Sequence, residues 1–441
     1  MSSKFFPLSI VCIFLFSGVY LFAQKKPNII FIMVDDMGYA DLGCYGSTIN
    51  KTPSIDQMAR EGVKLTQAYT AAPVCTPSRT AFMTGRYPAR TTVGLYEPLD
   101  WITSDSLVGL SAETPSLPSL IKQAGYTTHL IGKWHLGFTS KYSPNANGFD
   151  SFFGYHGGGV DYVSHTDPNG NMDLYENEKQ VKQEGYLTDL FAERAVSIIQ
   201  HKHDLPYFLS VQFNAPHWPW QAPGAAAYPL GGKESKQGGS IEIYKAMIES
   251  LDVAVGKILA AVKESGQAEN TLIVFTSDNG GERFSDMGGF KEKKFVLWEG
   301  GIREPAILVW PKKIKAGIVS DQPTIHMDFT ATFLWVAGAV QDTRFPMDGI
   351  NLLPLLSKKK LPIPRTFYWR VFQRNQQKSI RSGDWKYLQT EKEEYLFNLK
   401  TDPFEDYNVK MQYATIFTQL KEKYAIWELQ MLKPIPLPRK N

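Results

Sequence analysis

The sequence is poor in cysteine: its 441 residues include only three, Cys12, Cys44 and Cys75. So few cysteines exclude a disulfide framework, and we expect no disulfide bonds even if the chain is exported. Charge is almost balanced, with a formal net charge of +3, which gives no argument for binding to nucleic acid or to an anionic membrane surface. Neither internal repeats nor low-complexity tracts occur, so the composition predicts an ordinary folded chain.

Long hydrophobic runs are also scarce, and the one that occurs lies at the N-terminus. Lys4 precedes the apolar segment Phe5–Phe16, and a plausible cleavage sequence precedes Gln24. This order is typical of an export signal over residues 1–23, while the alternative is an uncleaved anchor that nearly spans a bilayer. Proline and glycine within the segment favour the signal. We therefore expect a periplasmic or secreted protein of a Gram-negative bacterium, without stable membrane association after cleavage.

The rest of the chain alternates between strand and helix patterns. Six consecutive apolar residues from Ile29 to Val34 predict a strand buried on both faces, as in a parallel sheet. Further strands are expected at residues 63–69, 126–131, 206–213, 271–276 and 305–310, and helices at 53–62, 117–124, 187–200, 244–262 and 326–337. The glycine-rich segment from 147 to 159 is expected to be a loop. These elements predict an α/β fold with a mostly parallel sheet flanked by helices.

The pattern changes near residue 345, where several prolines mark a linker. Short strands are expected at residues 367–371, 380–381, 385–388 and 395–397, followed by a helix around 414–432. We therefore expect a large catalytic domain over residues 24–345 and a small C-terminal subdomain over 346–441, built from an antiparallel sheet and one helix.

A segment around Cys75 has the features of a helix start that holds an anion. Thr76 is a good N-cap, Pro77 suits the first helical position and Gly85 can end the helix. Cys75 would then lie just ahead of a helix N-terminus, where the dipole favours negative charge, and Arg79 adds donors matched to a tetrahedral oxyanion. Such a cysteine is polarised toward thiolate and is a candidate nucleophile for phosphate or sulfate. The alternative is a buried free cysteine near a turn.

Acidic side chains follow two of the expected strands. Asp35 and Asp36 end the first strand, and Asp278 and Asn279 follow a later one. Because ligands bind beyond the carboxyl ends of strands in open α/β sheets, we expect these residues to converge at one edge. Three carboxylates and an amide suit Ca²⁺ or Mg²⁺ better than zinc. A solvated turn before Gly38 is the alternative for the first pair.

Basic residues follow other strands. Lys133 and His135 can point into one cleft, or can be a surface lysine beside a core histidine. His217 lies in a loop stiffened by prolines. Candidates for contact with a sugar come from loops of the same kind, although aromatic residues there can equally pack in the core: His165, Trp220 and Arg283.

The sequence Cys75-Thr76-Pro77-Ser78-Arg79, followed by Thr84-Gly85-Arg86, resembles the activation sequence of the type I sulfatases. Other segments resemble the family in the same order over nearly the whole mature chain: Gly-Lys-Trp-His at 132–135, Ala-Pro-His at 215–217 and Glu-Gly-Gly at 299–301. The resemblance implies an alkaline-phosphatase-like fold and a sulfuric ester hydrolase. It also implies that Cys75 is oxidised to formylglycine by a formylglycine-generating or anaerobic sulfatase-maturing enzyme.

The resemblance further implies roles for the site residues. One divalent cation, Ca²⁺ with Mg²⁺ as the alternative, would be bound by the following set: Asp35, Asp36, Cys75, Asp278 and Asn279. Arg79, Lys133 and Lys294 would neutralise the sulfate, and Lys294 is selected because it lies five residues before Glu-Gly-Gly. The hydrated formylglycine would attack sulfur, His217 with Lys294 would protonate the leaving group, and His135 would accept the proton that allows sulfate to be expelled.

The general resemblance is to bacterial carbohydrate sulfatases, so we expect a sulfated polysaccharide or oligosaccharide as substrate. Three other classes of function stay open: a phosphatase or phosphonate hydrolase on the same scaffold, a non-catalytic glycan-binding protein, and a membrane-tethered structural protein, which rests only on the N-terminal segment. A thiol phosphatase loop would carry about five residues between cysteine and arginine, whereas three separate Cys75 from Arg79. A binding protein would be expected to lack a metal ligand or a charged pocket residue, and none is missing.

Overall fold

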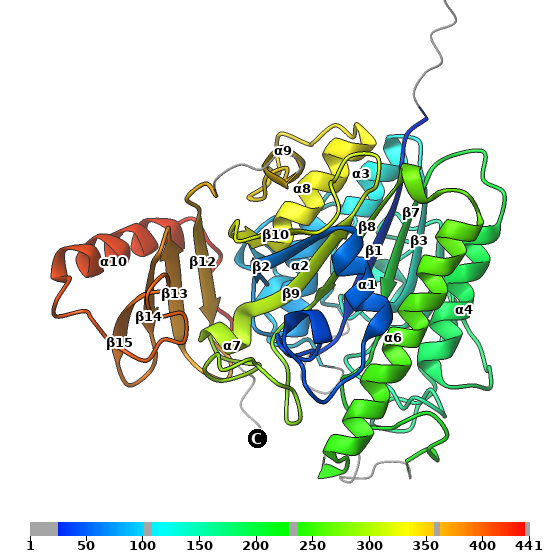
Figure 1. The fold of residues 1–441 in the computed structure, drawn as a ribbon, viewed down its shortest axis with the longest axis horizontal. Helices are drawn as coiled ribbons and strands as arrows, with labels where there is room; N and C mark the ends of the chain where they lie inside the picture. Colours follow the sequence, from blue (N-terminus) through cyan, green and yellow to red (C-terminus); the bar gives the residue numbers. More distant parts are fainter. Residues whose placement is uncertain (1–24, 101–106, 229–236, 357–361, 437–441) are drawn as a thin grey trace, which may run out of the picture.

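The computed structural model describes residues 25–100, 107–228, 237–356 and 362–436, so the expected export signal at residues 1–23 lies outside the described residues. At its centre is a mixed sheet (Figure 1) with strands in the spatial order β10 (Ile318–Ser320), β2 (Val63–Tyr69), β9 (Arg303–Val309), β8 (Thr271–Ser277), β1 (Asn28–Val34), β7 (Tyr207–Gln212), β3 (Thr127–Lys133), β4 (Ser151–Tyr155), β5 (Tyr175–Glu176) and β6 (Lys179–Gln180). A further strand, β11 (Thr324–Ile325), pairs with β2. Six of the ten pairings in this sheet are parallel, which confirms the expected fold class.

The middle of the sheet explains the apolar run near the N-terminus. β1 lies between β7 and β8, parallel to both, with Ile32 opposite Val211 on one side and Phe275 on the other. Every residue of β1 is buried, because helices cover both faces of the sheet. A strand in this position gains nothing from alternating polar residues, so its sequence is continuously apolar.

Helices pack on the two faces of the sheet in separate cores. One face is covered by α1 (Pro53–Glu61), α4 (Leu187–Gln200) and α6 (Ile241–Glu264), and the other by α2 (Cys75–Thr84), α3 (Leu117–Gln123) and α8 (His326–Ala337). All of these helices were expected from the sequence within a few residues, and their presence is confirmed. Among the described helices, even the 24-residue α6 does not combine length with the apolarity needed to cross a bilayer.

The C-terminal part forms a second, four-stranded sheet, which lies to the left of the main sheet in Figure 1. Its strands are β12 (Thr366–Val371), β13 (Gln377–Ser382), β14 (Trp385–Gln389) and β15 (Glu394–Asn398), all antiparallel to their neighbours. α10 (Ala414–Glu428) packs on β13 and β14 through Leu420, Tyr424 and Trp427. The expected small α+β unit is confirmed, although α10 ends earlier than the sequence suggested. The domain boundary at residues 345 and 346 stays a prediction.

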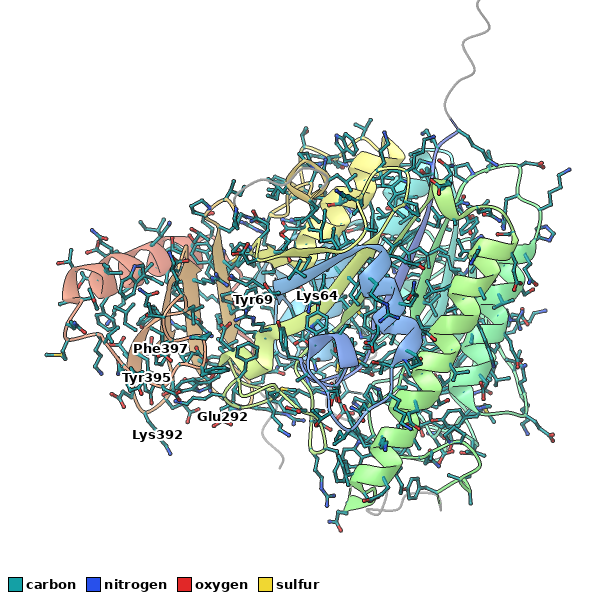
Figure 2. All side chains as sticks on the ribbon, in the orientation of Figure 1. Lys64, Tyr69, Glu292, Lys392, Tyr395 and Phe397 are labelled. Carbon is teal, nitrogen blue, oxygen red and sulfur yellow. The ribbon has the colours of Figure 1, made fainter. Side chains whose placement is uncertain are left out.

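The two sheets are joined through buried charged residues. Glu299 begins the short helix α7 (Glu299–Ile302), and its Oε1 lies 2.9 Å from Lys386 Nζ of β14. The same ammonium lies 2.8 Å from Glu405 Oε1, and all three side chains are fully buried. Tyr69 of β2, labelled in Figure 2 at the boundary between the two sheets, donates a 2.6 Å hydrogen bond to Glu299 Oε2. Arg381 of β13 in turn donates to the Tyr69 hydroxyl, so Glu299 is fixed from both sheets.

The expectation of a single loop from residue 147 to 159 is wrong. Ser151–Tyr155 forms β4, which extends the main sheet in parallel with β3. Gly154 lies opposite Gly132, where a Cβ would come within 1.9 Å of the Gly132 carbonyl oxygen. Glycine here allows a close approach between the backbones of neighbouring strands, so it does not mark a loop.

The expected start of α2 is also wrong by two residues. The helix begins at Cys75, with Val74 in the N-cap position. Thr76 does not cap it, because its hydroxyl donates to the carbonyl of His135 and accepts from the N–H of Leu99. Cys75 is therefore part of the first turn and does not precede it. The expected end is confirmed, since Gly85 adopts a left-handed conformation with φ of 66° and closes the helix.

Candidate active site

The parallel pairing of β1 and β8 brings two acidic strand ends to one edge of the sheet. The backbone N–H of Asp36 donates to Asp278 Oδ1 at 3.2 Å, and Asn279 Nδ2 donates to Asp36 Oδ1 at 2.7 Å. Asp35, Asp36, Asp278 and Asn279 are each at most 2 % exposed. The structure thus brings together the four residues that the sequence suggested as metal ligands.

A compact group of possible metal ligands forms at this edge. One carboxylate oxygen each of Asp35 and Asp36, the sulfur of Cys75 and a ring nitrogen of His217 all lie within 4.8 Å of one another. His217 was not expected among the ligands. Its membership reflects the parallel pairing of β7 with β1, which places the loop after β7 beside Asp36.

Asp278 and Asn279 complete this edge in different ways. Asp278 Oδ2 accepts from Nε and Nη2 of Arg79 at 3.1 and 2.9 Å, so one of its oxygens is already shared with a cation. Asn279 Oδ1 is buried and has no hydrogen-bond partner among the described residues. A buried amide oxygen without a partner, next to three carboxylates, fits a hard divalent cation such as Ca²⁺ or Mg²⁺.

Cys75 lies at the centre of the site, 2 % exposed, with its sulfur 3.6 Å from Asp35 Oδ1. Burial raises the pKa of the Cys75 thiol well above its usual range, although Lys133 and Lys294 act in the opposite direction. The expected thiolate is therefore wrong, because the first turn of α2 is buried beside carboxylates and is not open to solvent. A protonated thiol is a poor nucleophile.

Three buried cations surround the acidic edge. Lys133 Nζ lies 2.6 Å from Asp35 Oδ2, and Lys294 Nζ lies 2.7 Å from Asp36 Oδ2. Burial by itself lowers the pKa of Lys294, but the carboxylate of Asp36 holds it well above the usual range. Burial acts in the same way on Arg79, whose pKa Asp278 and Asp35 nevertheless raise. Arg79 and Lys294 are therefore charged at neutral pH.

His135 is held as a neutral acceptor. Its Nε2 lies 2.8 Å from the carbonyl oxygen of Leu99. A carbonyl can only accept, so Nε2 carries the proton, and Nδ1 is left with a lone pair and no partner among the described residues. Burial, with the nearby charge of Lys133, lowers the pKa of His135 well below its usual range. The imidazole is therefore neutral, and the lone pair of Nδ1 is its acceptor site.

His217 adopts the opposite tautomer. Its Nδ1 donates to the carbonyl of Trp218 at 2.5 Å, and its Nε2 lies 3.5 Å from Asp36 Oδ2. Burial lowers the pKa of His217 well below its usual range, although Asp36 acts in the opposite direction. In the neutral ring Nε2 has a lone pair and cannot donate, which bears on the general-acid role expected for this residue.

Backbone strain gathers around these groups. Asp36, His135 and Phe295 have φ values of 63°, 57° and 76°, in the left-handed region that non-glycine residues rarely occupy. Such residues cluster at functional sites, where packing holds an unfavourable backbone in place. Each of the three is a site residue or adjoins one.

A cavity of about 590 Å³ opens above the site. Cys75, His135, His217 and Lys294 line it, whereas Arg79 and Lys133 are not among the described lining residues. The cavity has the size of an ordinary ligand site.

Only two of the three expected sugar contacts reach the cavity. Trp220 and Arg283 line it, although Trp220 is only 4 % exposed and packs edge-on against Phe284. His165 does not line it: the ring is 1 % exposed and its Nε2 donates to the carbonyl of Gly185. We therefore correct the expectation that His165 binds substrate, because its polar atom is used within the fold.

Two other residues that line the cavity, Gly158 and Arg374, were not predicted from the sequence. Gly158 contacts the ring of His135, where a Cβ would come within 2.8 Å of two ring atoms. Arg374 reaches the cavity from the C-terminal subdomain. In the sequence Gly158 is only one of three consecutive glycines. No sequence signal indicates that Arg374, which is far from Cys75 along the chain, lines the same cavity.

Comparison with known proteins agrees with this geometry. A family model described as sulfatase matches residues 27–339, and one described as the C-terminal part of N-sulphoglucosamine sulphohydrolase matches residues 287–430. N-acetylgalactosamine-6-sulfatase of Homo sapiens is 34% identical over 374 residues, which are 79% of this chain and 69% of that protein. Steryl-sulfatase of Rattus norvegicus is 32% identical over 415 residues, and the match covers 75% of this chain and 70% of that protein.

A solved structure is similar over almost the whole chain. The crystal structure of Ps i-CgsB in complex with k-i-k-neocarrahexaose has a TM-score of 0.83 and 32% sequence identity. The match covers 93% of this chain and 94% of that one, and therefore includes both sheets.

Proposed function

The chain belongs to the sulfatase family, and we propose that it removes sulfate from a sulfated carbohydrate by using a modified Cys75 and one divalent cation. The observation that carries the proposal is the convergence of a buried cysteine, four acidic or amide side chains, three cations and two neutral histidines at one end of a cavity. A site with this composition can neutralise a sulfate monoester and move protons around it. The carbohydrate is supported by one relative that acts on N-acetylgalactosamine sulfate and by a solved structure that binds neocarrahexaose.

Cys75 is proposed to be converted to formylglycine by a formylglycine-generating or anaerobic sulfatase-maturing enzyme. The buried thiol supports this step, because its raised pKa leaves it protonated and unsuited to attack. The modified residue, as an aldehyde hydrate, would supply the hydroxyl that attacks sulfur. Its place in the first turn of α2 directs it toward the acidic edge and the cavity together.

The three cations are proposed to have two different tasks. Lys294 lines the cavity and would bind a sulfate oxygen. Arg79 and Lys133 lie behind the site and contact Asp278 and Asp35, so they would hold these carboxylates in place and balance their charge. The resemblance to the family implied only that all three neutralise the sulfate, and this proposal divides that task between them.

Proton transfer is proposed to involve His135 and Lys294 first. His135 has an unprotonated Nδ1 and would accept the proton whose removal allows sulfate to leave. Lys294 is a protonated group that lines the cavity, and it would donate a proton to the departing sugar oxygen. His217 would act as the acid only after its own Nε2 has been protonated, which its lowered pKa opposes.

The metal site is proposed to use Asp35, Asp36, Asp278 and Asn279 together with residue 75, and to hold Ca²⁺ or Mg²⁺. The orphaned Oδ1 of Asn279 and the hard oxygen ligands support this choice. A bound cation would neutralise charge on the sulfate. Export to the periplasm or medium is a further proposal, and it rests on the sequence of residues 1–23 alone.

The mass of the tryptic peptide Leu65–Arg79 tests the modification. Protein isolated from the native source is expected to show the mass loss that accompanies replacement of the thiol group by an aldehyde. Only the modified protein should hydrolyse 4-nitrophenyl sulfate. Cys75→Ala should abolish this activity, whereas Cys44→Ala, which changes the other free cysteine of the described chain, should retain it.

Two results would contradict the proposal. One is full sulfatase activity in protein whose Cys75 is entirely unmodified. The other is faster hydrolysis of 4-nitrophenyl phosphate than of the sulfate ester, which would favour a phosphatase on the same scaffold.

A further inference from the structure

The cavity receives one arginine from the C-terminal subdomain. Arg374 lies in the connection between β12 and β13 and lines the cavity beside residues of the main domain. Its guanidinium lies over the ring of Phe295, 4.3 Å from the ring centroid. The next residue, Asn375, donates from Nδ2 to the carbonyl of Phe295 at 3.3 Å. The connection is thus held against the segment that carries Lys294.

Phe295 relates Arg374 to the proposed sulfate site. The Lys294 ammonium lies 5.3 Å from the centroid of the same ring. The two distances together limit the separation of the lysine and arginine charges to about 10 Å. A glycan whose sulfate contacts Lys294 could therefore present a second charged substituent to Arg374 without leaving the cavity.

The hydrogen-bonding groups of Arg374 are available for such a substituent. The side chain is exposed, and none of the ion pairs among the described residues involves it. Contact with Phe295 holds the guanidinium over the ring, and no hydrogen bond among the described residues uses its N–H groups. This planar fork matches the paired oxygens of a sulfate ester or a carboxylate.

Arg283 supplies a second guanidinium at the cavity. It stacks on Phe284 at 4.8 Å, and its Nη1 donates to the carbonyls of Gln237 and Gly238 at 2.9 and 3.3 Å. The lysine beside the site, Lys293, is not available in the same way, because its ammonium donates to three backbone carbonyls.

Acidic side chains also line the cavity: Asp100, Asp167 and Glu282. Asp167 accepts backbone N–H groups of Asn169 and Asn171, and its charge is partly used in that turn. The charge of Glu282 acts on the ammonium of Lys294. Among the described residues, no ion pair joins Arg374 to Asp167 or Glu282, so neither occupies its guanidinium.

We propose that Arg374 forms a second anion subsite that binds a sulfate or carboxylate group of the glycan other than the sulfate that is removed. The proposal rests on the proposed sulfatase function and makes the enzyme selective for glycans with at least two anionic groups. Sulfate and carboxylate share the chemistry that an arginine fork recognises, and the experiment separates them.

The test uses hydrolysis of 4-nitrophenyl sulfate, which has no second anion, as the reporter. Inhibition constants are measured for galactose 6-sulfate, for galactose 4,6-disulfate and for galactose 6-sulfate linked to glucuronic acid. In the wild-type enzyme the second anion should lower the inhibition constant about tenfold, the effect of one charge-assisted contact. Arg374→Ala should abolish this gain while kcat and KM for the aryl sulfate change less than about twofold.

Arg344→Ala is the matched control. Arg344 is also exposed and stacks on a neighbouring phenylalanine, Phe345, at 5.8 Å, but it does not line the cavity. The control should keep the wild-type preference. A gain seen with only one of the two second anions supports the subsite and identifies its ligand.

The subsite is overturned if the wild type gains nothing from either second anion. It is also overturned if Arg374→Ala lowers kcat for the aryl sulfate as much as it weakens inhibition, because the arginine would then act on Lys294 through Phe295. If the wild type hydrolyses no sulfate ester, the proposed function fails. Thermal stabilisation by the same sugars then decides the subsite separately, with the same expected difference between wild type and Arg374→Ala.

Discussion

Lys386→Met should destabilise the protein strongly, although the residue lies outside the active site. The substitution removes the one ammonium that lies within 3 Å of both Glu299 and Glu405, and all three groups are fully buried. Methionine fills much of the same space, so the main effect is the loss of charge compensation. Leaving buried charges without their partner costs about 3 to 5 kcal/mol in the free energy of unfolding. That is a large share of the roughly 5 to 15 kcal/mol of an ordinary protein.

A matched lysine is available on the neighbouring strand. Lys378 of β13 lies 2.7 Å from Glu428 Oε2, but the two side chains are 40% and 27% exposed. Lys378→Met should therefore cost no more than about 1 kcal/mol, because solvent screens the pair. The two variants share the substitution and nearly the same distance, so the comparison isolates the effect of burial.

Urea unfolding of the wild type and both variants measures these differences. Burial raises the pKa of Glu405 to about 7 even beside Lys386, so the carboxyl should be largely neutral once the lysine is gone. Replacing it in the double variant Lys386→Met/Glu405→Gln should then recover part of the lost stability. Equal effects of Lys386→Met and Lys378→Met, or a double variant less stable than Lys386→Met, would refute the reasoning.

Three further predictions concern other parts of the chain. Burial lowers the pKa of His129 from 6.5 to about 4, so the folded state favours the neutral ring, and the free energy of unfolding falls as the pH drops from 6.5 toward 4. Urea unfolding should show that the free energy of unfolding decreases by about 2 kcal/mol between pH 7 and 5, and His129→Gln should remove this decrease. An unchanged pH dependence in the variant would contradict the assignment. Asn279→Ala removes the orphaned amide oxygen, so the rise in Tm on adding Ca²⁺ should need at least about tenfold more Ca²⁺, and an unchanged titration would place the metal elsewhere. Gly158→Ala would bring a Cβ within 2.8 Å of the His135 ring and should lower kcat about tenfold or more with little change in Tm, whereas wild-type kcat would show that the ring position is unimportant.

The fold could be predicted largely because buried strands and helix faces leave local patterns. The run before Asp35 identified a central strand, and pairing of β1 with β8 then required Asp278 to lie near it. β4 was missed because its glycine serves a close contact with β3, and a glycine-rich sequence more often marks a loop. Local composition cannot show that a glycine is required by close contact with the backbone of a neighbouring strand.

Site residues that follow strand ends could be predicted from the sequence. The protonation state and the contacts of buried side chains could not. The position of Cys75 at the start of a helix suggested a thiolate, but burial raises the pKa of the thiol more than the nearby lysines lower it. His165 was predicted to contact the sugar because it lies in a polar loop, but its Nε2 donates a hydrogen bond to the carbonyl of Gly185. These outcomes depend on which distant segments cover a side chain, and one sequence does not specify that directly.

The C-terminal subdomain takes part in building the site and is more than an appended module. The backbone N–H of Leu297 donates to Gln377 Oε1 at 2.7 Å, and that of Glu299 donates to Glu405 Oε2 at 2.7 Å. Both donors follow Lys294 within five residues, so the subdomain holds the segment that carries the proposed sulfate-binding lysine.

Lys386 acts on this segment through the same two glutamates, and Arg374 reaches the cavity from the same subdomain. Loss of compensation at Lys386 should therefore lower kcat/KM for an aryl sulfate as well as stability, whereas loss of Arg374 should change only the preference for a second anion. The two variants thus separate how the subdomain supports the reaction from how it selects the substrate.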